Sequence, residues 1–250
     1  MSELLRTESM SVVYGGLHAV NGLDLRVDEG RLVGLIGPNG AGKTSFIDGI
    51  SGFTRTQGAI HFRGKRVDRE PAHRRARLGL GRTWQSLELF EDLTVRENLQ
   101  VGAERQTVGG FLLDLVRPGR RRDQSDVDWA LDVLGIAHLA DRLPTEISHG
   151  QRKLVGAGRT LAARPALICM DEPAAGLDTT ESEQFGRRLR RIVEAGVSIL
   201  LVDHDMGLVM GVCDEVYVIE FGTKIAHGTP AQVVADERVR AAYLGTKAGI

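Results

Sequence analysis

The sequence predicts an α/β fold in which a mainly parallel sheet is covered by helices on both faces. From residue 151 onward, apolar runs at 166–170, 197–202 and 216–220 alternate with helical stretches. The runs are mostly aliphatic and β-branched, which is typical of strands buried on both faces. A third observation is the apolar run 31–36, which leads straight into a glycine-rich loop and a helix.

The first 80 residues predict short strands separated by glycine and charged turns such as 28–30. These strands are expected at residues 9–14, 19–27, 31–36 and 59–62. Between residues 94 and 143 the pattern changes to helical periodicity, with Ser125 and Asp128 as an expected N-cap pair. This middle block is therefore expected to be a helical insertion into the α/β core.

After the insertion, helices are expected between the apolar strands. One covers residues 151–163 and is expected to begin near Arg152. A second is opened by Thr180 and Glu183, which fit a capping box, and runs to Glu194. A third, short helix starts at Met206.

Composition and charge narrow the function classes. A chain of 250 residues can form one sizeable domain, and a net charge of −1 gives no overall attraction to nucleic acid or anionic lipid. The arginine clusters at 74–77 and 117–122 are expected to be solvated loops. Cys169 and Cys213 lack metal-ligand spacing and are expected to be buried, reduced thiols. No run of 18 apolar residues occurs, so any membrane role is expected through a partner.

Residues 37–44 form the pattern Gly-x-x-x-x-Gly-Lys-Thr between a predicted strand and a predicted helix. Glycines let backbone N–H groups turn toward phosphate oxygens, and the helix N-terminus adds partial positive charge. Lys43 would reach the β- and γ-phosphates, and the Thr44 hydroxyl would bind Mg²⁺. The residues expected to bind the triphosphate are Gly37, Pro38, Asn39, Gly40, Ala41, Gly42, Lys43, Thr44 and Ser45.

Two carboxylates follow the predicted strand 166–170, where ligands of open α/β sheets bind. Asp171 can hold Mg²⁺ through water, and Glu172 can take the proton of an attacking water. His204 follows the next strand and could touch a γ-phosphate, while Gln85 could orient water or metal. A second phosphate contact is expected ahead of the helix near Arg152, from Ser148, His149, Gly150 and Gln151.

These motifs, in this order, resemble the nucleotide-binding subunits of ABC transporters along essentially the whole chain. In that resemblance 37–44 is Walker A, Gln85 the Q-loop, 148–151 the signature, 167–172 Walker B, Asp178 part of the D-loop and His204 the switch histidine. Tyr14 matches the aromatic residue that stacks on adenine, although a core tyrosine at a strand end is the alternative.

The fold that the resemblance implies is a P-loop NTPase (RecA-like) core with a parallel sheet, an N-terminal antiparallel β subdomain and a helical insertion. Within a single domain of residues 1–250, we expect the β subdomain with Walker A and the Q-loop at 1–90. The helical subdomain with the signature is expected at 91–160, and the remaining core at 161–250.

Further segments are similar to ATPases that import branched-chain and other hydrophobic amino acids. They are residues 79–85, 89–98, 110–113, 203–211 and 242–245. The chain departs from the family pattern at His149, where the signature has glycine, at Trp84, where Phe is usual, and at Asp203, where Glu is commoner.

The resemblance implies ATP and Mg²⁺ as cofactors and a head-to-tail dimer. ATP would lie between Walker A of one subunit and residues 148–151 and Asp178 of the other, identical or paralogous, subunit. The partners would be transmembrane permease subunits and, indirectly, an extracytoplasmic solute-binding protein, at the cytoplasmic face of the membrane; no nucleic acid is implied. The alternatives are a urea or amide importer, a lipopolysaccharide-type exporter, and an ABC ATPase of iron–sulfur cluster assembly.

Overall fold

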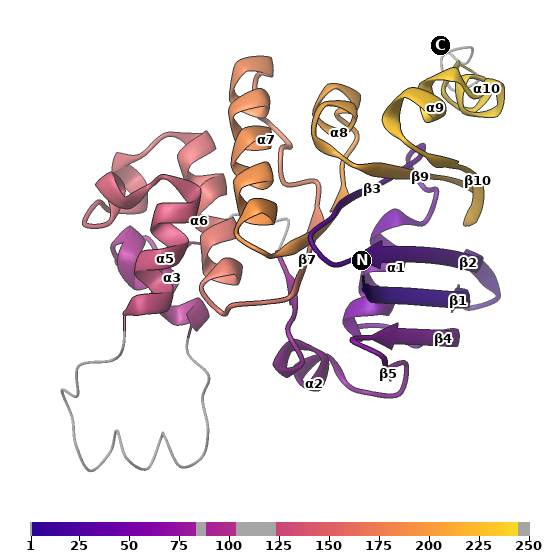
Figure 1. Cartoon of the computed structure of the whole chain (residues 1–250), viewed down its shortest axis with the longest axis horizontal. Helices are drawn as coiled ribbons and strands as arrows, with labels where there is room; N and C mark the ends of the chain where they lie inside the picture. Colours follow the sequence, from indigo (N-terminus) through magenta and orange to yellow (C-terminus); the bar gives the residue numbers. More distant parts are fainter. Residues whose placement is uncertain (1, 84–88, 104–123, 245–250) are drawn as a thin grey trace. The chain divides into compact units, whose positions relative to one another are not determined.

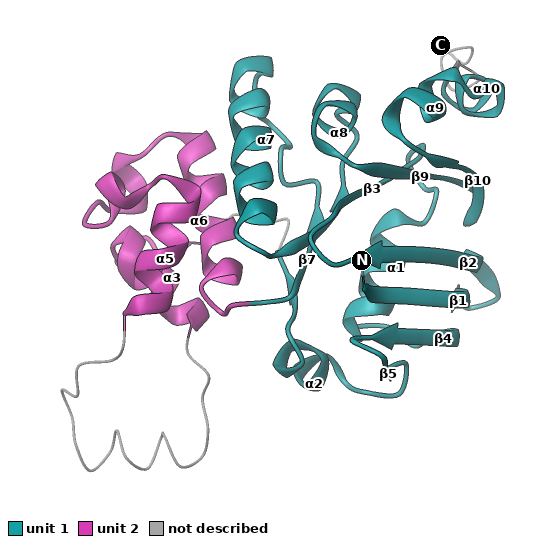
Figure 2. Cartoon of the chain, in the orientation of Figure 1, with its two compact units in different colours: residues 1–86, 165–250 teal, residues 87–164 magenta. Residues whose placement is uncertain are grey.

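The computed structural model describes residues 2–83, 89–103 and 124–244. The chain divides into two compact units (Figure 2): unit 1 comprises residues 1–86 and 165–250, and unit 2 comprises residues 87–164. None of the helices in the described ranges is both long and apolar enough to cross a bilayer.

Unit 1 contains a six-stranded sheet in the order β10-β9-β3-β8-β7-β6. Its strands are β3 (Leu32–Ile36), β6 (Leu80–Arg82), β7 (Leu167–Asp171), β8 (Ser198–Val202), β9 (Glu215–Glu220) and β10 (Thr223–Gly228). All neighbours pair in parallel except β10, which runs antiparallel to β9. Strands β3, β7 and β8 are buried along their whole length. The predicted parallel α/β sheet is therefore confirmed.

A second, antiparallel sheet of unit 1 has the order β2-β1-β4-β5. Its strands are β1 (Glu3–Tyr14), β2 (Leu17–Asp28), β4 (Gln57–Phe62) and β5 (Lys65–Arg66). This sheet confirms the expected N-terminal antiparallel β structure. Because β3 belongs to the parallel sheet, the first 90 residues contribute strands to both sheets.

Helix α1 (Lys43–Ser51) contacts strands of both sheets of unit 1. Its buried Phe46, Ile47 and Ile50 join one core with side chains of the antiparallel sheet, such as Phe62, and of the parallel sheet, such as Leu200. Figure 1 shows α1 on one side of the parallel sheet and the helices α7 (Thr179–Glu194) and α8 (Met206–Val212) on the other. Helices α9 (Pro230–Ala235) and α10 (Glu237–Leu244) end the described chain.

Unit 2 is helical in its described part, as the periodicity predicts. It consists of α3 (Val95–Ala103), α5 (Ser125–Leu134), α6 (His149–Leu161) and the short 3₁₀ turns Ala137–Leu139 and Pro144–Glu146. Its helices cross closely: a Cβ atom added at Gly102 would lie 1.9 Å from the carbonyl oxygen of Arg159. Gly158 leaves room in the same way for the buried side chains of Leu99 and Leu134.

Three predicted helix starts were wrong by one to three residues. Helix α5 has Gln124 rather than Ser125 as its N-cap, and Ser125 is already helical. Helix α7 is capped by Asp178, whose carboxylate accepts a 2.8 Å hydrogen bond from the N–H of Glu181. Thr180 lies inside the first turn and has a helical backbone. It cannot cap the helix, because the N-cap residue has an extended backbone. Helix α6 begins at His149, ahead of the predicted start.

The cluster 74–77, predicted to be a solvated loop, includes a buried arginine instead. It forms most of α2 (Ala72–Arg77), and Arg75 is 2% exposed. The Arg75 guanidinium donates hydrogen bonds to the carbonyl oxygens of Gly49, Ile50, Asp68 and Glu70. Burial lowers the pKa of Arg75, but these four acceptors satisfy the charge. The other predicted cluster, 117–122, lies outside the described residues.

Candidate functional site

The glycine-rich loop 37–42 is held tightly between neighbouring strands. A Cβ atom added at Gly37 would lie 2.1 Å from the carbonyl oxygen of Ile219. At Gly42 it would lie 2.0 Å from the carbonyl oxygen of Ala19, and the backbone there has a φ of +99°. The N–H of Gly222 also bonds to the carbonyl oxygen of Ala41 at 3.0 Å. Glycine is therefore required at both positions, and the loop is fixed before any ligand arrives.

The N-terminus of α1 is open to an anion. Its N-cap is Gly42, which has no side chain and makes no capping hydrogen bond. The first N–H groups of the helix and its partial positive charge are therefore available to phosphate oxygens. Thr44 and Ser45, which the sequence assigns to the same site, lie in this first turn.

Lys43 supplies a buried cation at the loop. Its side chain is 6% exposed, and its ammonium donates to the carbonyl oxygens of Gly37 at 2.7 Å and Pro38 at 3.0 Å. Burial lowers the Lys43 pKa, while the nearby carboxylates of Glu172 and Asp171 act in the opposite direction. In this position the ammonium lies at the glycine-rich loop, where an anion bound by the loop could replace either carbonyl oxygen as its partner.

Asp171 is a buried carboxylate whose hydrogen-bonding capacity is not used. It is 1% exposed, and neither oxygen accepts a hydrogen bond of normal geometry. Burial raises the Asp171 pKa, and the Thr44 hydroxyl and the Arg82 charge oppose this. A buried carboxylate without a well-formed hydrogen bond is a site that a cation would satisfy.

Asp171 and Thr44 fit a Mg²⁺ ion that shares its ligands with a substrate, rather than a metal ion that only protein side chains hold. Within the described residues, no group of three or more His, Cys, Asp and Glu side chains could hold a metal. Mg²⁺ typically takes one or two protein oxygens together with substrate phosphates and water. The carboxylate of Asp171 and the hydroxyl of Thr44 supply such oxygens beside the phosphate loop.

Glu172 and His204 lie next to each other at the ends of adjacent strands. The His204 Nδ1 atom is 3.8 Å from Glu172 Oε1 and 3.7 Å from Asp203 Oδ1. Glu172 has a φ of +48°, which is rare for a residue with a side chain. Its N–H is held by the carbonyl oxygen of Val202 at 2.7 Å, so the unusual conformation is imposed by the neighbouring strand.

Asp203 and Asp205 flank the histidine and hold its loop. Asp203 is 1% exposed and accepts hydrogen bonds from the N–H groups of Ala174 and Asp205. Asp205 caps α8 and accepts a 2.6 Å hydrogen bond from the Ser182 hydroxyl on α7. The sequence reasoning missed these roles of Asp205 and Ser182. The signal was an Asp immediately before the helix that starts at 206.

The parallel sheet brings most of the predicted site to one edge. Leu35 and Asp171 both pair with Val202, so β3, β8 and β7 end at the same level. Lys43, Asp171 and His204, which follow or end these strands, therefore lie at the carboxyl edge, where ligands of such sheets bind. Tyr14 ends β1 and is 44% exposed, which rules out the core alternative. The Q-loop residue Gln85 and Trp84 lie outside the described residues.

The residues predicted to form the signature, 148–151, lie in unit 2 at the start of α6. Ser148 is its N-cap: its hydroxyl accepts from the N–H of Gln151, and the Gln151 side chain accepts from the N–H of Ser148. Ser148 and His149 are exposed, so the imidazole that replaces the usual glycine fills no core space. In unit 1, Asp178 is likewise an exposed-loop residue that caps α7.

Comparison with known proteins agrees with this geometry. The family model described as ABC transporter matches residues 20–175, and a model described as branched-chain amino acid ATP-binding cassette transporter matches residues 223–249. The chain is 36% identical to the high-affinity branched-chain amino acid transport ATP-binding protein BraF of Pseudomonas aeruginosa, over 97% of this chain and 98% of BraF. It is 35% identical to the lipopolysaccharide export system ATP-binding protein LptB of Haemophilus influenzae, over 97% of each.

Solved structures show the same relationship. The ADP conformation of MJ1267, an ATP-binding cassette of an ABC transporter, superposes with a TM-score of 0.86 at 29% identity, covering 98% of this chain and all of that one. A nucleotide-free ATP-binding cassette from an ABC transporter gives a TM-score of 0.84, also at 29% identity, over 97% of this chain and 99% of that one. The chain therefore belongs to the ABC transporter family and is an ATP-binding, ATP-hydrolysing member of it.

Proposed function

We propose that this chain is the ATPase subunit of an ABC importer for branched-chain or other hydrophobic amino acids, bound at the cytoplasmic face of a membrane through permease subunits. The observation that carries the choice of solute is the match of residues 223–249 to a model of branched-chain amino acid cassettes. The 36% identity to BraF over almost the whole chain supports it. Hydrolysis itself rests on the arrangement of Lys43, Asp171 and Glu172 described above.

In the proposed reaction the protein mainly positions groups. The loop 37–42 and the open N-terminus of α1 surround the phosphates, and Lys43 moves from two carbonyl oxygens to the β- and γ-phosphates. Asp171 and Thr44 would hold Mg²⁺, which neutralises charge on the phosphates when it is bound. Tyr14, exposed at the end of β1, can stack on the adenine ring.

Glu172 acts as the general base in this proposal. Its carboxylate accepts a proton from the attacking water, and the water oxygen attacks the γ-phosphorus in line with the leaving ADP oxygen. His204, 3.8 Å from that carboxylate, contacts the γ-phosphate and holds the geometry between water and phosphate. Gln85 is proposed to orient the water or the metal.

We infer that the complete site needs a second ATP-binding subunit. Residues 148–151 and Asp178 would complete the γ-phosphate site of the other subunit, since Ser148 offers an exposed hydroxyl at a helix N-terminus. ATP would then favour the closed dimer and hydrolysis would open it. The insertion at 91–160 and Gln85 would pass this change to the permease.

The test is transport by the reconstituted complex. The chain, its permease subunits and the solute-binding protein are placed in proteoliposomes with ATP inside, and uptake of labelled leucine is compared with that of urea. ATP-dependent leucine uptake supports the proposal, whereas uptake of urea alone would contradict the choice of solute.

A lipopolysaccharide-type exporter ATPase is the second candidate, because LptB is 35% identical over 97% of both chains. It predicts co-purification with export permeases and no leucine uptake. An ABC ATPase of iron–sulfur assembly type would co-purify with partners that do not span the membrane.

A further inference from the structure

Positive charge is concentrated in one short stretch of the chain. Residues 55–82 contain nine Lys and Arg against two Asp and Glu, a net charge of +7, whereas the whole chain has a net charge of −1. Two of these arginines are structural: Arg75 is buried among carbonyl groups, and Arg82 pairs with Asp48 at 2.5 Å. The remaining cations of this stretch are available at the surface.

Four of them line one hollow between β5 and α2, and a fifth lies beside it. The hollow has a volume of about 420 Å³ and is lined by Lys65 and Arg66 of β5, Arg74 and Arg77 of α2, and the side chains of Val67, Glu70 and Leu78. Arg63 adjoins it, donating to the carbonyl oxygen of Leu78 at 3.4 Å. We call Arg63, Lys65, Arg66, Arg74 and Arg77 the basic surface; all five are exposed.

The charges of the basic surface are only partly compensated. Arg66 pairs with Asp68 at 2.7 Å and Arg74 with Glu70 at 3.1 Å. In the described part of the chain, no ion pair joins Arg63, Lys65 or Arg77 to a carboxylate. The basic surface therefore retains a net positive charge that the fold itself does not use.

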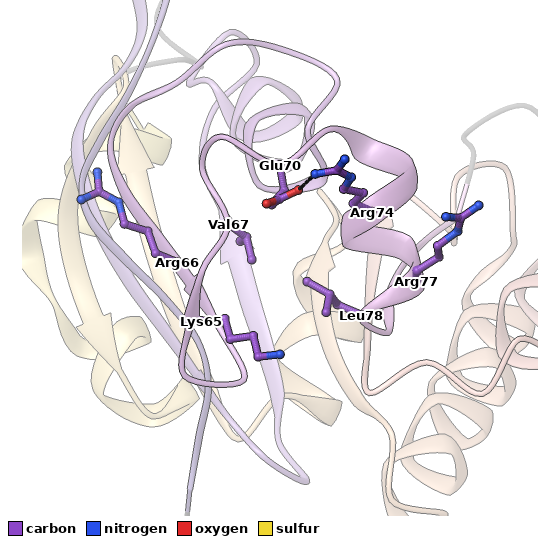
Figure 3. Close-up of a pocket in the computed structure, with 7 residues that line it drawn as sticks. All are labelled: Lys65, Arg66, Val67, Glu70, Arg74, Arg77 and Leu78. Atoms are coloured by element: carbon purple, nitrogen blue, oxygen red, sulfur yellow. Dashed lines mark hydrogen bonds and ion pairs between the residues drawn. The ribbon is translucent and has the colours of Figure 1, made fainter.

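The charged side chains that line the hollow do not converge on one point. Figure 3 shows Arg66 and Arg77 extending to opposite sides of the hollow, while Lys65 reaches from β5 toward α2 and Arg74 is joined to Glu70. A single small anion would need converging donors. A broad array of separate cations around a shallow hollow instead matches a surface that presents many anionic groups.

We propose that the basic surface docks on anionic phospholipid headgroups at the membrane that holds the permease. Basic residues near such a surface each strengthen binding, and their contributions fall off within a Debye length. The hollow can admit a headgroup phosphate between Lys65 and α2, with Val67 and Leu78 beneath its glycerol carbons. This contact is weak by itself and adds to docking on the permease. It does not depend on ATP hydrolysis.

The test is co-sedimentation of the whole chain with vesicles, without nucleotide. One set of vesicles contains phosphatidylcholine alone. The other contains phosphatidylcholine with about 30 mol% of the anionic lipid phosphatidylglycerol. The chain should bind only the anionic vesicles, and binding should weaken between low and physiological salt.

Lys65→Ala/Arg77→Ala should weaken binding to anionic vesicles about 30-fold, since each basic residue near the surface contributes a factor of about five. Among the described residues neither Lys65 nor Arg77 forms an ion pair that the change would break, and ATP hydrolysis at the parent rate would show that the variant is folded. Arg77→Lys, which keeps the charge, should bind like the parent. The matched control is Arg187→Ala/Arg188→Ala, which removes the same charge from α7 and should change nothing.

Two results would overturn the proposal. One is binding of the parent to neither kind of vesicle, or to both equally. The other is equal weakening by the Lys65/Arg77 and Arg187/Arg188 double variants. The parent protein could also fail to bind vesicles while Lys65→Ala/Arg77→Ala fails to assemble with the permease. In that case the basic surface binds a protein partner, and the lipid proposal is wrong.

Discussion

Replacing Lys43 by alanine tests the phosphate loop most simply. In the free protein its ammonium bonds to two neutral carbonyl oxygens, at 2.7 and 3.0 Å. With ATP these bonds are exchanged for bonds to charged phosphate oxygens. A hydrogen bond to a charged group contributes about 1.5–3 kcal/mol, against about 0.5–1.5 kcal/mol for a neutral pair. Two exchanged bonds therefore contribute about 2–3 kcal/mol to binding.

Lys43→Ala should raise the Kd of ATP about 30- to 140-fold, at about 1.4 kcal/mol per factor of ten. Binding of adenosine, which has no phosphate, should change far less. Isothermal titration calorimetry with both ligands measures the difference, and a thermal melt checks that the variant is folded. The matched control is Lys65→Ala, which removes an exposed lysine far from the loop in sequence. ATP affinity within about threefold of the parent would refute the Walker A assignment.

Three further outcomes are expected. Tyr14→Ala should weaken ATP by about 1–3 kcal/mol, the usual worth of aromatic stacking on a base, with an unchanged melting temperature because Tyr14 is already 44% exposed. Arg75→Met should lower the free energy of unfolding in urea by about 3–5 kcal/mol, since four buried carbonyls lose their donor, whereas Arg74→Met should change it by less than about 1 kcal/mol. Burial raises the pKa of Cys169 to about 12 and also raises that of Cys213, so iodoacetamide at about pH 8 should label neither thiol until the chain is unfolded.

The sequence was sufficient to predict the parallel sheet and its edge. Continuous apolar runs identify buried strands, and parallel strands end at one edge, so Lys43, Asp171 and His204 could be brought together without coordinates. The glycine pattern also predicted a phosphate-binding loop, although only the structure shows that the carbonyl oxygens of Ile219 and Ala19 leave no room for a side chain at Gly37 and Gly42.

Side-chain partners could not be predicted in the same way. The segment 74–77 has three arginines among four residues, which suggests a solvated loop. Nothing in this order shows that Arg75 is the arginine that turns inward. Its acceptors lie up to 26 residues away in the chain, and they become neighbours only when α1 and α2 meet. Helix starts were misplaced for a related reason: Thr180 and Asp178 both have capping side chains, and backbone conformation decides between them.

The central claim is that Glu172 is the general base of an ATP site that Lys43, Thr44 and Asp171 hold together. Glu172→Gln keeps the size of the side chain but cannot accept the proton, so ATP hydrolysis should fall about 10²- to 10⁴-fold while ATP binding persists. Size-exclusion chromatography with ATP and Mg²⁺, with the paralogous subunit added where one exists, should then show an ATP-bound dimer. Asp171→Asn should instead lose Mg²⁺-dependent binding together with turnover. Hydrolysis by Glu172→Gln at the parent rate would contradict the account.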